Sequence, residues 1–161
     1  MIQSGSVLAL RPSTNGLGVF TLDAIRAGSW VMEYRGRIVS AAELPVPYDA
    51  TDDRYVQVGR DAYLGPSGGF DDYVNHSCDP TCWLRITADH FALFALRDIA
   101  AGEELAFDYS PTMSGDDWTM PCACASALCR GTVSEFATLS AVTQRRYLAL
   151  GIVPAYVHRR S

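Results

Sequence analysis

Short runs of apolar residues, separated by turn-forming residues, dominate the first two thirds of the chain. They cover residues 7–10, 18–20, 30–34, 55–58, 91–96 and 104–109. Runs of this length, bounded by Gly, Pro, Asn or Asp, are typical of β-strands. Asn15-Gly16, between the first two runs, is a typical hairpin turn. The pattern therefore predicts a mainly β protein built from short strands.

A helix is predicted only near the C-terminus, over residues 140–150. Ser140 is a favourable N-cap, and Gly151 followed by Pro154 is a typical helix end. Between the last predicted strand and this helix, residues 110–121 are rich in Pro, Ser, Gly and Asp. That composition predicts a mobile connection.

Length and composition favour one ordinary globular domain. The chain has 161 residues, of which 48% are hydrophobic and 19% charged. No apolar run approaches the ~20 residues of a membrane span. The first six residues lack the basic start and apolar centre of a signal peptide. We therefore expect a soluble intracellular protein without a membrane partner, in the cytoplasm if bacterial and in the nucleus or cytoplasm if eukaryotic.

The charge balance constrains the partners. The formal net charge is −5, the sequence pI is about 5.0, and all 13 basic residues are Arg. Nucleic-acid affinity comes mainly from neutralising phosphates, so we expect no direct nucleic-acid binding. An acidic surface is compatible with a basic protein or peptide substrate, which its field would attract.

Three of the five cysteines cluster as Cys122-Ala-Cys124 and, five residues later, Cys129. This spacing is too cramped for easy disulfide formation, and it suits thiolates that converge on one metal ion. A closed zinc site needs four ligands, so a fourth must come from elsewhere in the chain. Among the cysteines, the spacing leaves both Cys78 and Cys82 open.

The polar stretch 75–82 lies between two apolar runs and has the sequence Asn-His-Ser-Cys-Asp-Pro-Thr-Cys. Asn, Ser and Asp bond readily to nearby backbone, and Pro80 disfavours helix at the preceding residue. The stretch therefore predicts a tight loop that connects two strands. Taken alone it is best interpreted as a simple turn, and only its combination with other motifs changes that interpretation.

Four motifs occur in order before the cysteine cluster. They are Gly16-Leu17-Gly18, Tyr34-Arg35-Gly36, Asn75-His76-Ser77-Cys78-Asp79-Pro80, and the run from Gly102 to Phe107-Asp108-Tyr109. Together with the cysteines, they resemble the SET-domain protein lysine methyltransferases that carry a post-SET zinc segment. The resemblance spans roughly residues 7–131. It divides the chain into a SET domain at 1–110 with a loop-rich insertion at about 48–72, a post-SET segment at 111–131, and a C-terminal helix and tail at 132–161.

The resemblance implies a β-clip or SET fold of small curved sheets with a pseudo-knot, in which residues 75–78 and the strand ending at Tyr109 cross. It also implies methyl transfer from S-adenosylmethionine to a lysine ε-nitrogen of a basic protein, with a histone-like tail as the default substrate. The amine must lose its proton, although its ordinary pKa is about 10.4. An apolar, aromatic channel disfavours the ammonium form.

The resemblance also implies roles for individual residues. Tyr109 would be the catalytic tyrosine, Tyr34 a second catalytic tyrosine of the channel, and Phe107 a substrate-channel residue that leaves room for more than one methyl group. Cys78 would join Cys122, Cys124 and Cys129 as the fourth zinc ligand. The residues expected to bind the cofactor are Gly16, Leu17, Gly18, Tyr55, Tyr73, Asn75 and His76.

Some features depart from the family pattern. Asp72 stands where the family usually has Arg, which reverses a charge near the cofactor. This favours the alternative that the chain is a catalytically inactive, zinc-stabilised interaction module. The predicted C-terminal helix and its tail match none of the motifs, so they either pack beneath the zinc segment or meet another subunit.

Overall fold

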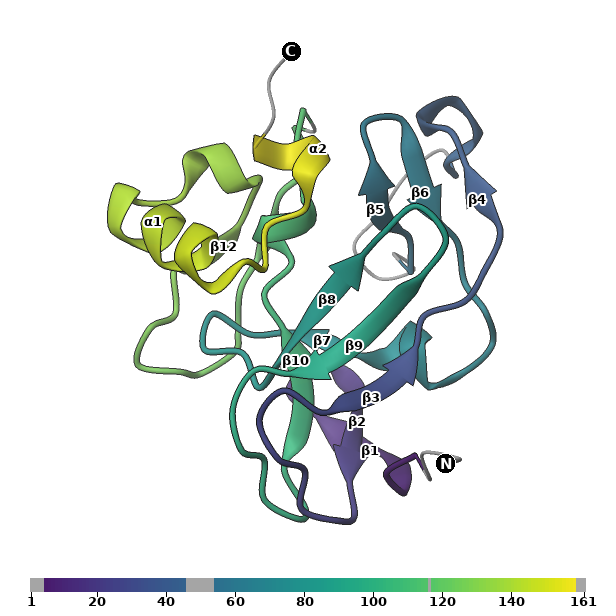
Figure 1. The fold of residues 1–161 in the computed structure, drawn as a ribbon, viewed down its shortest axis with the longest axis vertical. Helices are drawn as coiled ribbons and strands as arrows, with labels where there is room; N and C mark the ends of the chain where they lie inside the picture. The colour runs from purple at the N-terminus through teal and green to yellow at the C-terminus, as the bar shows by residue number, and fades with distance from the viewer. Residues whose placement is uncertain (1–4, 46–53, 116, 159–161) are drawn as a thin grey trace.

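A computed structural model describes residues 5–45, 54–115 and 117–158 (Figure 1). Short strands dominate these residues, as the apolar runs predict. The strands are β1 (Leu8–Ser13), β2 (Gly16–Thr21), β3 (Trp30–Glu33), β4 (Ile38–Val39), β5 (Val56–Gly59), β6 (Ala62–Leu64), β7 (Asn75–His76), β8 (Cys82–Ile86), β9 (Phe91–Ala95), β10 (Glu104–Phe107), β11 (Met120–Pro121) and β12 (Thr132–Val133). The helices are α1 (Ala141–Leu150) and α2 (Ala155–His158), with 3-10 turns η1 (Ala41–Glu43), η2 (Phe70–Tyr73), η3 (Ser110–Thr112) and η4 (Phe136–Thr138).

The largest sheet has the order β1-β2-β10-β8-β9-β3. Its first two strands form the predicted antiparallel hairpin, in which Ser13 pairs with Gly16 across the turn. Gly16 has a φ of 87°, which a glycine adopts without strain. Two further sheets lie outside this one, with the order β4-β6-β5 and a β11-β12 pair.

Both ends of the stretch 75–82 lie against β10. Asn75 and His76 of β7 pair in parallel with Ala106 and Phe107, and Cys82 of β8 pairs with the same Phe107. This is the contact that the expected pseudo-knot requires. The mainly β fold with small curled sheets is confirmed.

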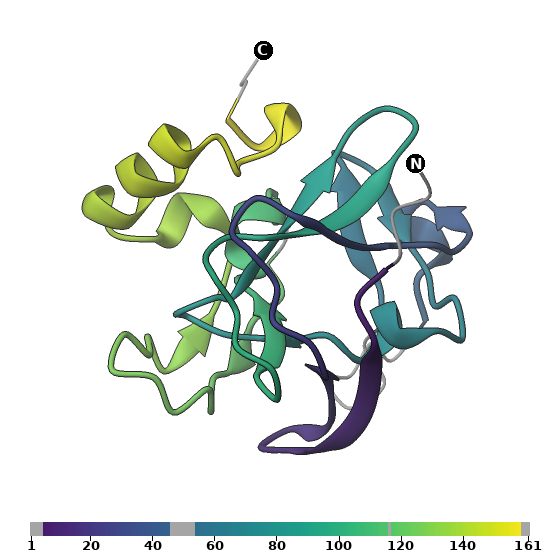
Figure 2. The ribbon, with the colours of Figure 1, turned by 60° about the horizontal axis from the view of Figure 1, so that its bottom comes forward.

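The predicted C-terminal helix is present as α1. Its first turn is capped by Ser140, whose hydroxyl accepts the backbone N–H of Thr143 at 3.2 Å, and it ends at Gly151 with a φ of 69°. The sequence pattern did not predict α2. Figures 1 and 2 show α1 and α2 together on one side of the molecule, away from β1.

The first four residues of the connection at 110–121 differ from the prediction of a mobile segment. Ser110, Pro111, Thr112 and Met113 are buried, and the first three form η3. They are covered from the C-terminal side, where a second apolar cluster of Phe136, Leu139, Tyr147, Ile152, Val153 and Val157 packs against Trp83, Leu96 and Tyr156. Asp116 lies outside the described residues.

The expected insertion at about 48–72 is described from residue 54 onward, where it contains β5, β6 and η2. Its residues 48–53 lie outside the described residues, as do residues 159–161 of the tail. Within the described ranges, no helix is both long and apolar enough to cross a bilayer.

Candidate functional site

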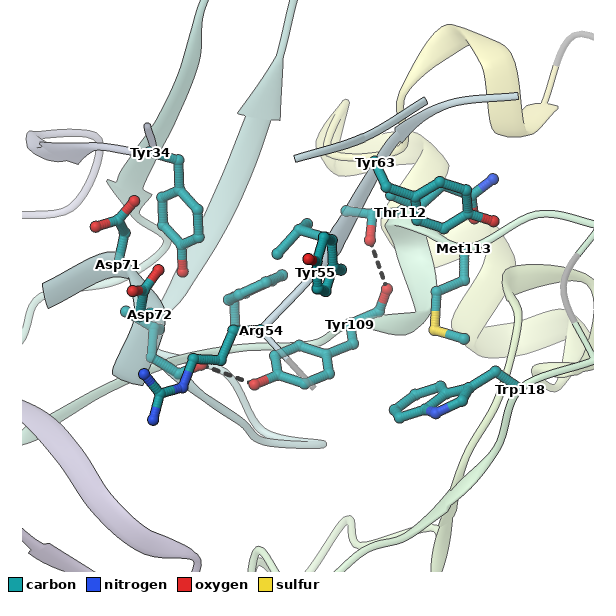
Figure 3. Close-up of a pocket in the computed structure, with 14 residues that line it drawn as sticks. Tyr34, Arg54, Tyr55, Tyr63, Asp71, Asp72, Tyr109, Thr112, Met113 and Trp118 are labelled. Carbon is teal, nitrogen blue, oxygen red and sulfur yellow. Dashed lines mark hydrogen bonds between the residues drawn. The ribbon is translucent and has the colours of Figure 1, made fainter. Parts of the chain in front are cut away.

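An open cavity of about 620 Å³ lies where β5, β6, η2 and the chain after β10 meet (Figure 3). Its walls are strongly aromatic, with Tyr34, Tyr55, Tyr63, Phe107, Tyr109 and Trp118 among the lining residues. The two expected catalytic tyrosines, the expected channel residue Phe107 and the expected cofactor residue Tyr55 thus share one cavity.

Phe107 lies between the two expected catalytic tyrosines. The ring of Tyr34 meets it edge-on, with centroids 6.1 Å apart, and the ring of Tyr109 lies 4.7 Å away. The hydroxyl of Tyr109 donates a hydrogen bond to the backbone oxygen of Val74 at 2.7 Å. One apolar ring therefore packs against the rings of both tyrosines.

The hydroxyl of Tyr34 is buried and makes no hydrogen bond within the described part of the chain. Burial raises the pKa of Tyr34 well above its ordinary value, so the group stays protonated. A buried polar group without a partner is costly in a folded protein. Tyr34 therefore brings a buried, unpartnered hydroxyl to the wall of the cavity.

Asp71 and Asp72 line the same cavity, and both carboxylates bind neighbouring backbone. Asp72 accepts the N–H groups of Ser67 and Gly68, at 2.9 and 2.7 Å. Asp71 accepts the N–H of Arg35 at 2.8 Å. The residue that departs from the family pattern therefore stabilises the loop that precedes η2.

The other expected cofactor residues do not line this cavity. They are Gly16, Leu17, Gly18, Tyr73, Asn75 and His76. Instead, the side-chain amide of Asn75 donates to the backbone oxygen of Leu17 at 3.1 Å and to Glu104 at 2.8 Å. A Cβ atom on Gly18 would lie 2.2 Å from an oxygen of Glu104. Gly18 therefore leaves the space that Glu104 needs to bind Asn75, and β2, β7 and β10 are joined at this point.

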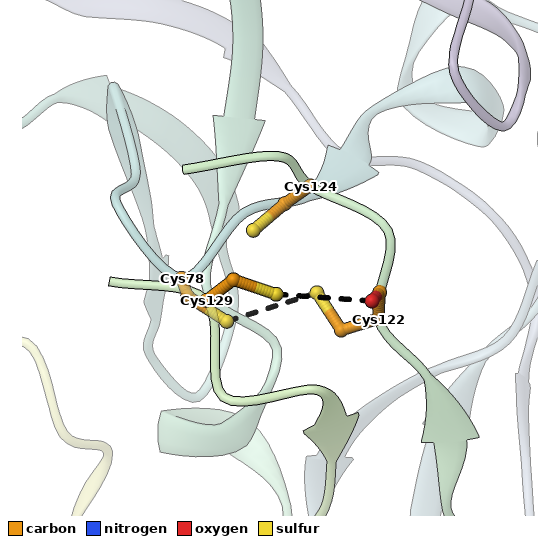
Figure 4. A group of neighbouring side chains, drawn as sticks. All are labelled: Cys78, Cys122, Cys124 and Cys129. Carbon is orange, nitrogen blue, oxygen red and sulfur yellow. Dashed lines mark hydrogen bonds between the residues drawn. The ribbon is translucent and has the colours of Figure 1, made fainter. Parts of the chain in front are cut away.

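Four thiols lie together beside β7 (Figure 4). The sulfurs of Cys78, Cys122, Cys124 and Cys129 are all within 4.8 Å of one another, and those of Cys78 and Cys122 are 3.7 Å apart. Four thiolates around zinc, at bonds of about 2.3 Å, have sulfurs about 3.8 Å apart. The donor set and its spacing thus fit a structural zinc ion.

Cys82 is not part of this cluster. It is fully buried on β8, where burial raises the pKa of its thiol to about 12. Of the two candidates that the spacing left open, the structure brings Cys78 to the other three thiols.

His76 lies between this thiol cluster and Tyr109. Its Nδ1 accepts the backbone N–H of Tyr109 at 3.1 Å, and its Nε2 lies 3.3 Å from the sulfur of Cys78. Burial lowers the pKa of His76 to about 4, with Asp108 opposing and Arg130 adding to the effect. The ring is therefore neutral at pH 7, with its proton on Nε2, pointing to the sulfur.

Asp108 belongs to one of the sequence motifs, but the sequence indicated no role for it; among the described residues, its carboxylate accepts hydrogen bonds from three partners. It accepts two hydrogen bonds from the guanidinium of Arg130, at 2.7 and 2.8 Å, and one from the hydroxyl of Tyr147 at 2.7 Å. The backbone N–H of Ser110 adds a fourth at 3.0 Å. The sequence signal that could have marked Asp108 is its position between two aromatic residues at the end of an apolar strand. A charged residue at such a position is expected to be buried, and a buried charge needs partners.

The sequence interpretation also missed Arg54 and Trp118, which line the cavity. The guanidinium of Arg54 lies over the ring of Tyr73, 4.8 Å from its centroid. Trp118 is the one large aromatic residue of the connection 110–121 and lies shortly before Cys122. Its position in an otherwise polar segment was the signal that could have marked it.

A family model described as "SET domain" matches residues 16–110. An H3 lysine-4 specific histone-lysine N-methyltransferase of Saccharomyces cerevisiae is 32% identical over 142 residues, which cover 78% of this chain and 13% of the relative. Histone-lysine N-methyltransferase SUV39H2 of Xenopus tropicalis is 34% identical over 146 residues, which cover 72% of this chain and 36% of the relative. The chain therefore spans about a third or less of either relative.

Among solved structures, KRYPTONITE in complex with mCHH DNA, an H3(1-15) peptide and SAH superposes with a TM-score of 0.65. The sequence identity is 22%, and the match covers 80% of this chain and 30% of that chain. At this identity, the superposition shows that the two chains share a fold.

Proposed function

Because this chain belongs to the SET-domain family, we propose that it is an S-adenosylmethionine-dependent protein-lysine N-methyltransferase that acts on a basic protein. Relatives named as histone-lysine N-methyltransferases support the reaction class and make a histone-like tail the first substrate to test. The observation that carries the proposal is the aromatic cavity in which the rings of Tyr34 and Tyr109 both pack against Phe107 and the hydroxyl of Tyr34 has no partner among the described residues.

The cavity suits an uncharged amine on a long apolar stem. Phe107 and the tyrosine rings remove water from the stem and disfavour the ammonium form, which lowers the pKa of the amine, while the carboxylates of Asp71 and Asp72 on the same cavity oppose that effect. The hydroxyl of Tyr34, the hydroxyl of Tyr109 and the backbone oxygen of Val74 are the polar groups that we propose orient the nitrogen. Phe107 has no hydroxyl of its own, and this leaves room for more than one methyl group. Catalysis then depends mainly on position and on the exclusion of water.

The cofactor, when bound, would supply a methyl group activated by a sulfonium charge. The residues proposed to hold it are Gly16, Leu17, Gly18, Tyr73, Asn75 and His76, on or beside β2 and β7, together with Tyr55 from the aromatic cavity. Leu17 is apolar yet 44% exposed, and Phe70 on the adjacent η2 is 40% exposed. Exposed apolar surface of this kind, next to the two glycines that flank Leu17, fits a small-molecule ligand.

Zinc is proposed to be held by Cys78, Cys122, Cys124 and Cys129. Cys78 belongs to the segment that follows β7, and the other three belong to the segment 122–129. Four sulfur ligands would therefore fasten the post-SET segment to the part of the chain that carries Asn75 and His76. Such a site stabilises the fold, since binding energy becomes folding energy.

The charge around the cavity supports a basic substrate. Asp71 and Asp72 both line it, and the net charge of the chain is −5. KRYPTONITE, whose fold this chain shares, was solved in complex with both a histone H3 peptide and DNA. The absence of direct nucleic-acid binding thus stays a prediction that rests on the acidic composition.

The test has two stages. Calorimetry with S-adenosylmethionine measures binding, and labelled cofactor with histone H3 and a panel of other basic proteins then measures transfer. We expect binding and lysine methylation, and we expect Tyr109→Phe to lower the rate by about a hundredfold through misplacement of the amine, with near-normal cofactor binding. Binding without transfer to any member of the panel would support the inactive interaction module instead.

A further inference from the structure

We propose that the C-terminal segment, residues 135–157, positions Tyr109 for the reaction, with Tyr147 and Tyr156 as its two positioning residues. The inference rests on the proposed function, because that function gives Tyr109 its role. This segment lies beyond the family match, which ends at residue 110. It also contains none of the motifs that the sequence offered.

Tyr109 needs support from outside the sheet. Strand β10 ends at Phe107, and so the regular pairing that fixes Phe107 stops before Tyr109. Tyr109 projects from a chain that continues directly into η3. His76 and Val74 bind Tyr109 directly, and its placement depends further on whatever holds the rest of residues 108–115.

Tyr147 of α1 binds the residue next to Tyr109. Its hydroxyl donates to Asp108 at 2.7 Å, and both side chains are almost completely buried. Arg130 of the post-SET segment binds the same carboxylate through two nitrogens. Several hydrogen bonds from different directions hold the buried Asp108 carboxylate in a single position. The carboxylate in turn fixes the backbone from which Tyr109 projects.

Tyr156 of α2 connects two walls of the cavity. Its hydroxyl contacts the backbone oxygen of Gln57 on β5, at 2.8 Å, and the backbone oxygen of Thr112 on η3. Gln57 and Thr112 both line the cavity. The side chain of Gln57 adds two hydrogen bonds to the backbone of Ser114, each at 2.9 Å.

Two further contacts complete the support. The backbone N–H of Phe136 donates to the oxygen of Met113 at 3.1 Å, and the carboxylate of Glu135 accepts the N–H of Gly115 at 2.7 Å. Residues 135–157 thus bind the segment 108–115 at four places. Residues 108–115 therefore form one wall of the cavity, and residues 135–157 hold that wall in place.

Tyr147→Phe and Tyr156→Phe remove only the hydroxyl groups, and the combined variant removes both. For the combined variant, we expect kcat for methyl transfer to fall about tenfold or more, because small misplacements at a reacting centre are costly, with little change in the KM for the cofactor. Amide hydrogen exchange is expected to accelerate in residues 108–115 and to stay unchanged in β8 and β9. The control is Leu148→Ala, an exposed position next to Tyr147 on α1, which should keep the parent kcat and exchange.

A lower Tm with unchanged kcat and unchanged exchange at 108–115 would reduce both tyrosines to a general structural role and overturn the proposal. If the parent chain itself transfers no methyl group, the proposed function fails. Exchange in residues 108–115 then decides by itself whether the two hydroxyl groups hold this segment, since that measurement needs no substrate.

Discussion

The Nε2 atom of His76 lies 3.3 Å from the sulfur of Cys78, while Nδ1 of the same ring accepts the backbone N–H of Tyr109. One imidazole therefore connects a proposed metal ligand to the proposed catalytic tyrosine. N–H groups that point at ligand atoms orient them and tune their basicity. The placement of Tyr109 and the strength of the metal site are thus expected to vary together.

Replacing His76 by Ala is expected to lower zinc affinity by about 10- to 100-fold, the usual effect of losing a group that hydrogen-bonds to a metal ligand. Competition with a chromophoric chelator measures this directly. His90→Ala is the matched control, since the His90 side chain is 67% exposed. Equal affinity in the His76 variant and the control would show that the 3.3 Å contact does not support the metal site.

Replacing Cys124 by Ser is expected to release zinc, because it removes one of the four converging sulfurs. Metal analysis of the purified protein gives the stoichiometry, and hydrogen exchange over residues 120–133 reports the loosening of the post-SET segment. Treating the parent chain with a chelator should produce the same exchange pattern. Cys82→Ala, outside the cluster, should keep the full metal content, and undiminished zinc in the Cys124 variant would break the proposed ligand set.

Tyr34→Phe is expected to lower the transfer rate while leaving the free energy of unfolding almost unchanged. The Tyr34 hydroxyl has no hydrogen-bond partner among the described residues, so its removal should change the free energy of unfolding by no more than about 1 kcal/mol. The transfer rate should nevertheless fall about tenfold or more, since a group that orients the amine is lost. Urea denaturation and steady-state kinetics measure the two quantities. A variant with parent activity would remove Tyr34 from the mechanism.

Asp72→Ala is expected to destabilise the fold by about 1–2 kcal/mol, because the carboxylate binds two backbone N–H groups of the preceding loop. Urea denaturation provides the measurement. Asp89→Ala, in the exposed loop between β8 and β9, serves as the control for loss of a surface carboxylate. If both variants are as stable as the parent, the hydrogen bonds of Asp72 contribute nothing, and its charge beside the cavity would need another explanation.

The sequence by itself determined the local features. Short apolar runs and turn residues predicted the hairpin at Asn15-Gly16, and the Ser140 cap and Gly151 predicted the limits of α1. These features depend on neighbouring residues, and so local propensity is sufficient to find them. The ordered motifs likewise indicated the SET family and a site that included Tyr34, Phe107 and Tyr109, which the structure brings to one cavity.

Only the tertiary structure decided which residues meet across the chain. Cys78 and Cys82 are four residues apart, yet one joins the thiol cluster and the other enters the core, because the chain turns back onto β10 between them. Asp108 meets Arg130 and Tyr147, which are 22 and 39 residues away. No local pattern specifies such a pairing, since a buried carboxylate shows only that partners are needed, and the packing of the C-terminal segment selects them.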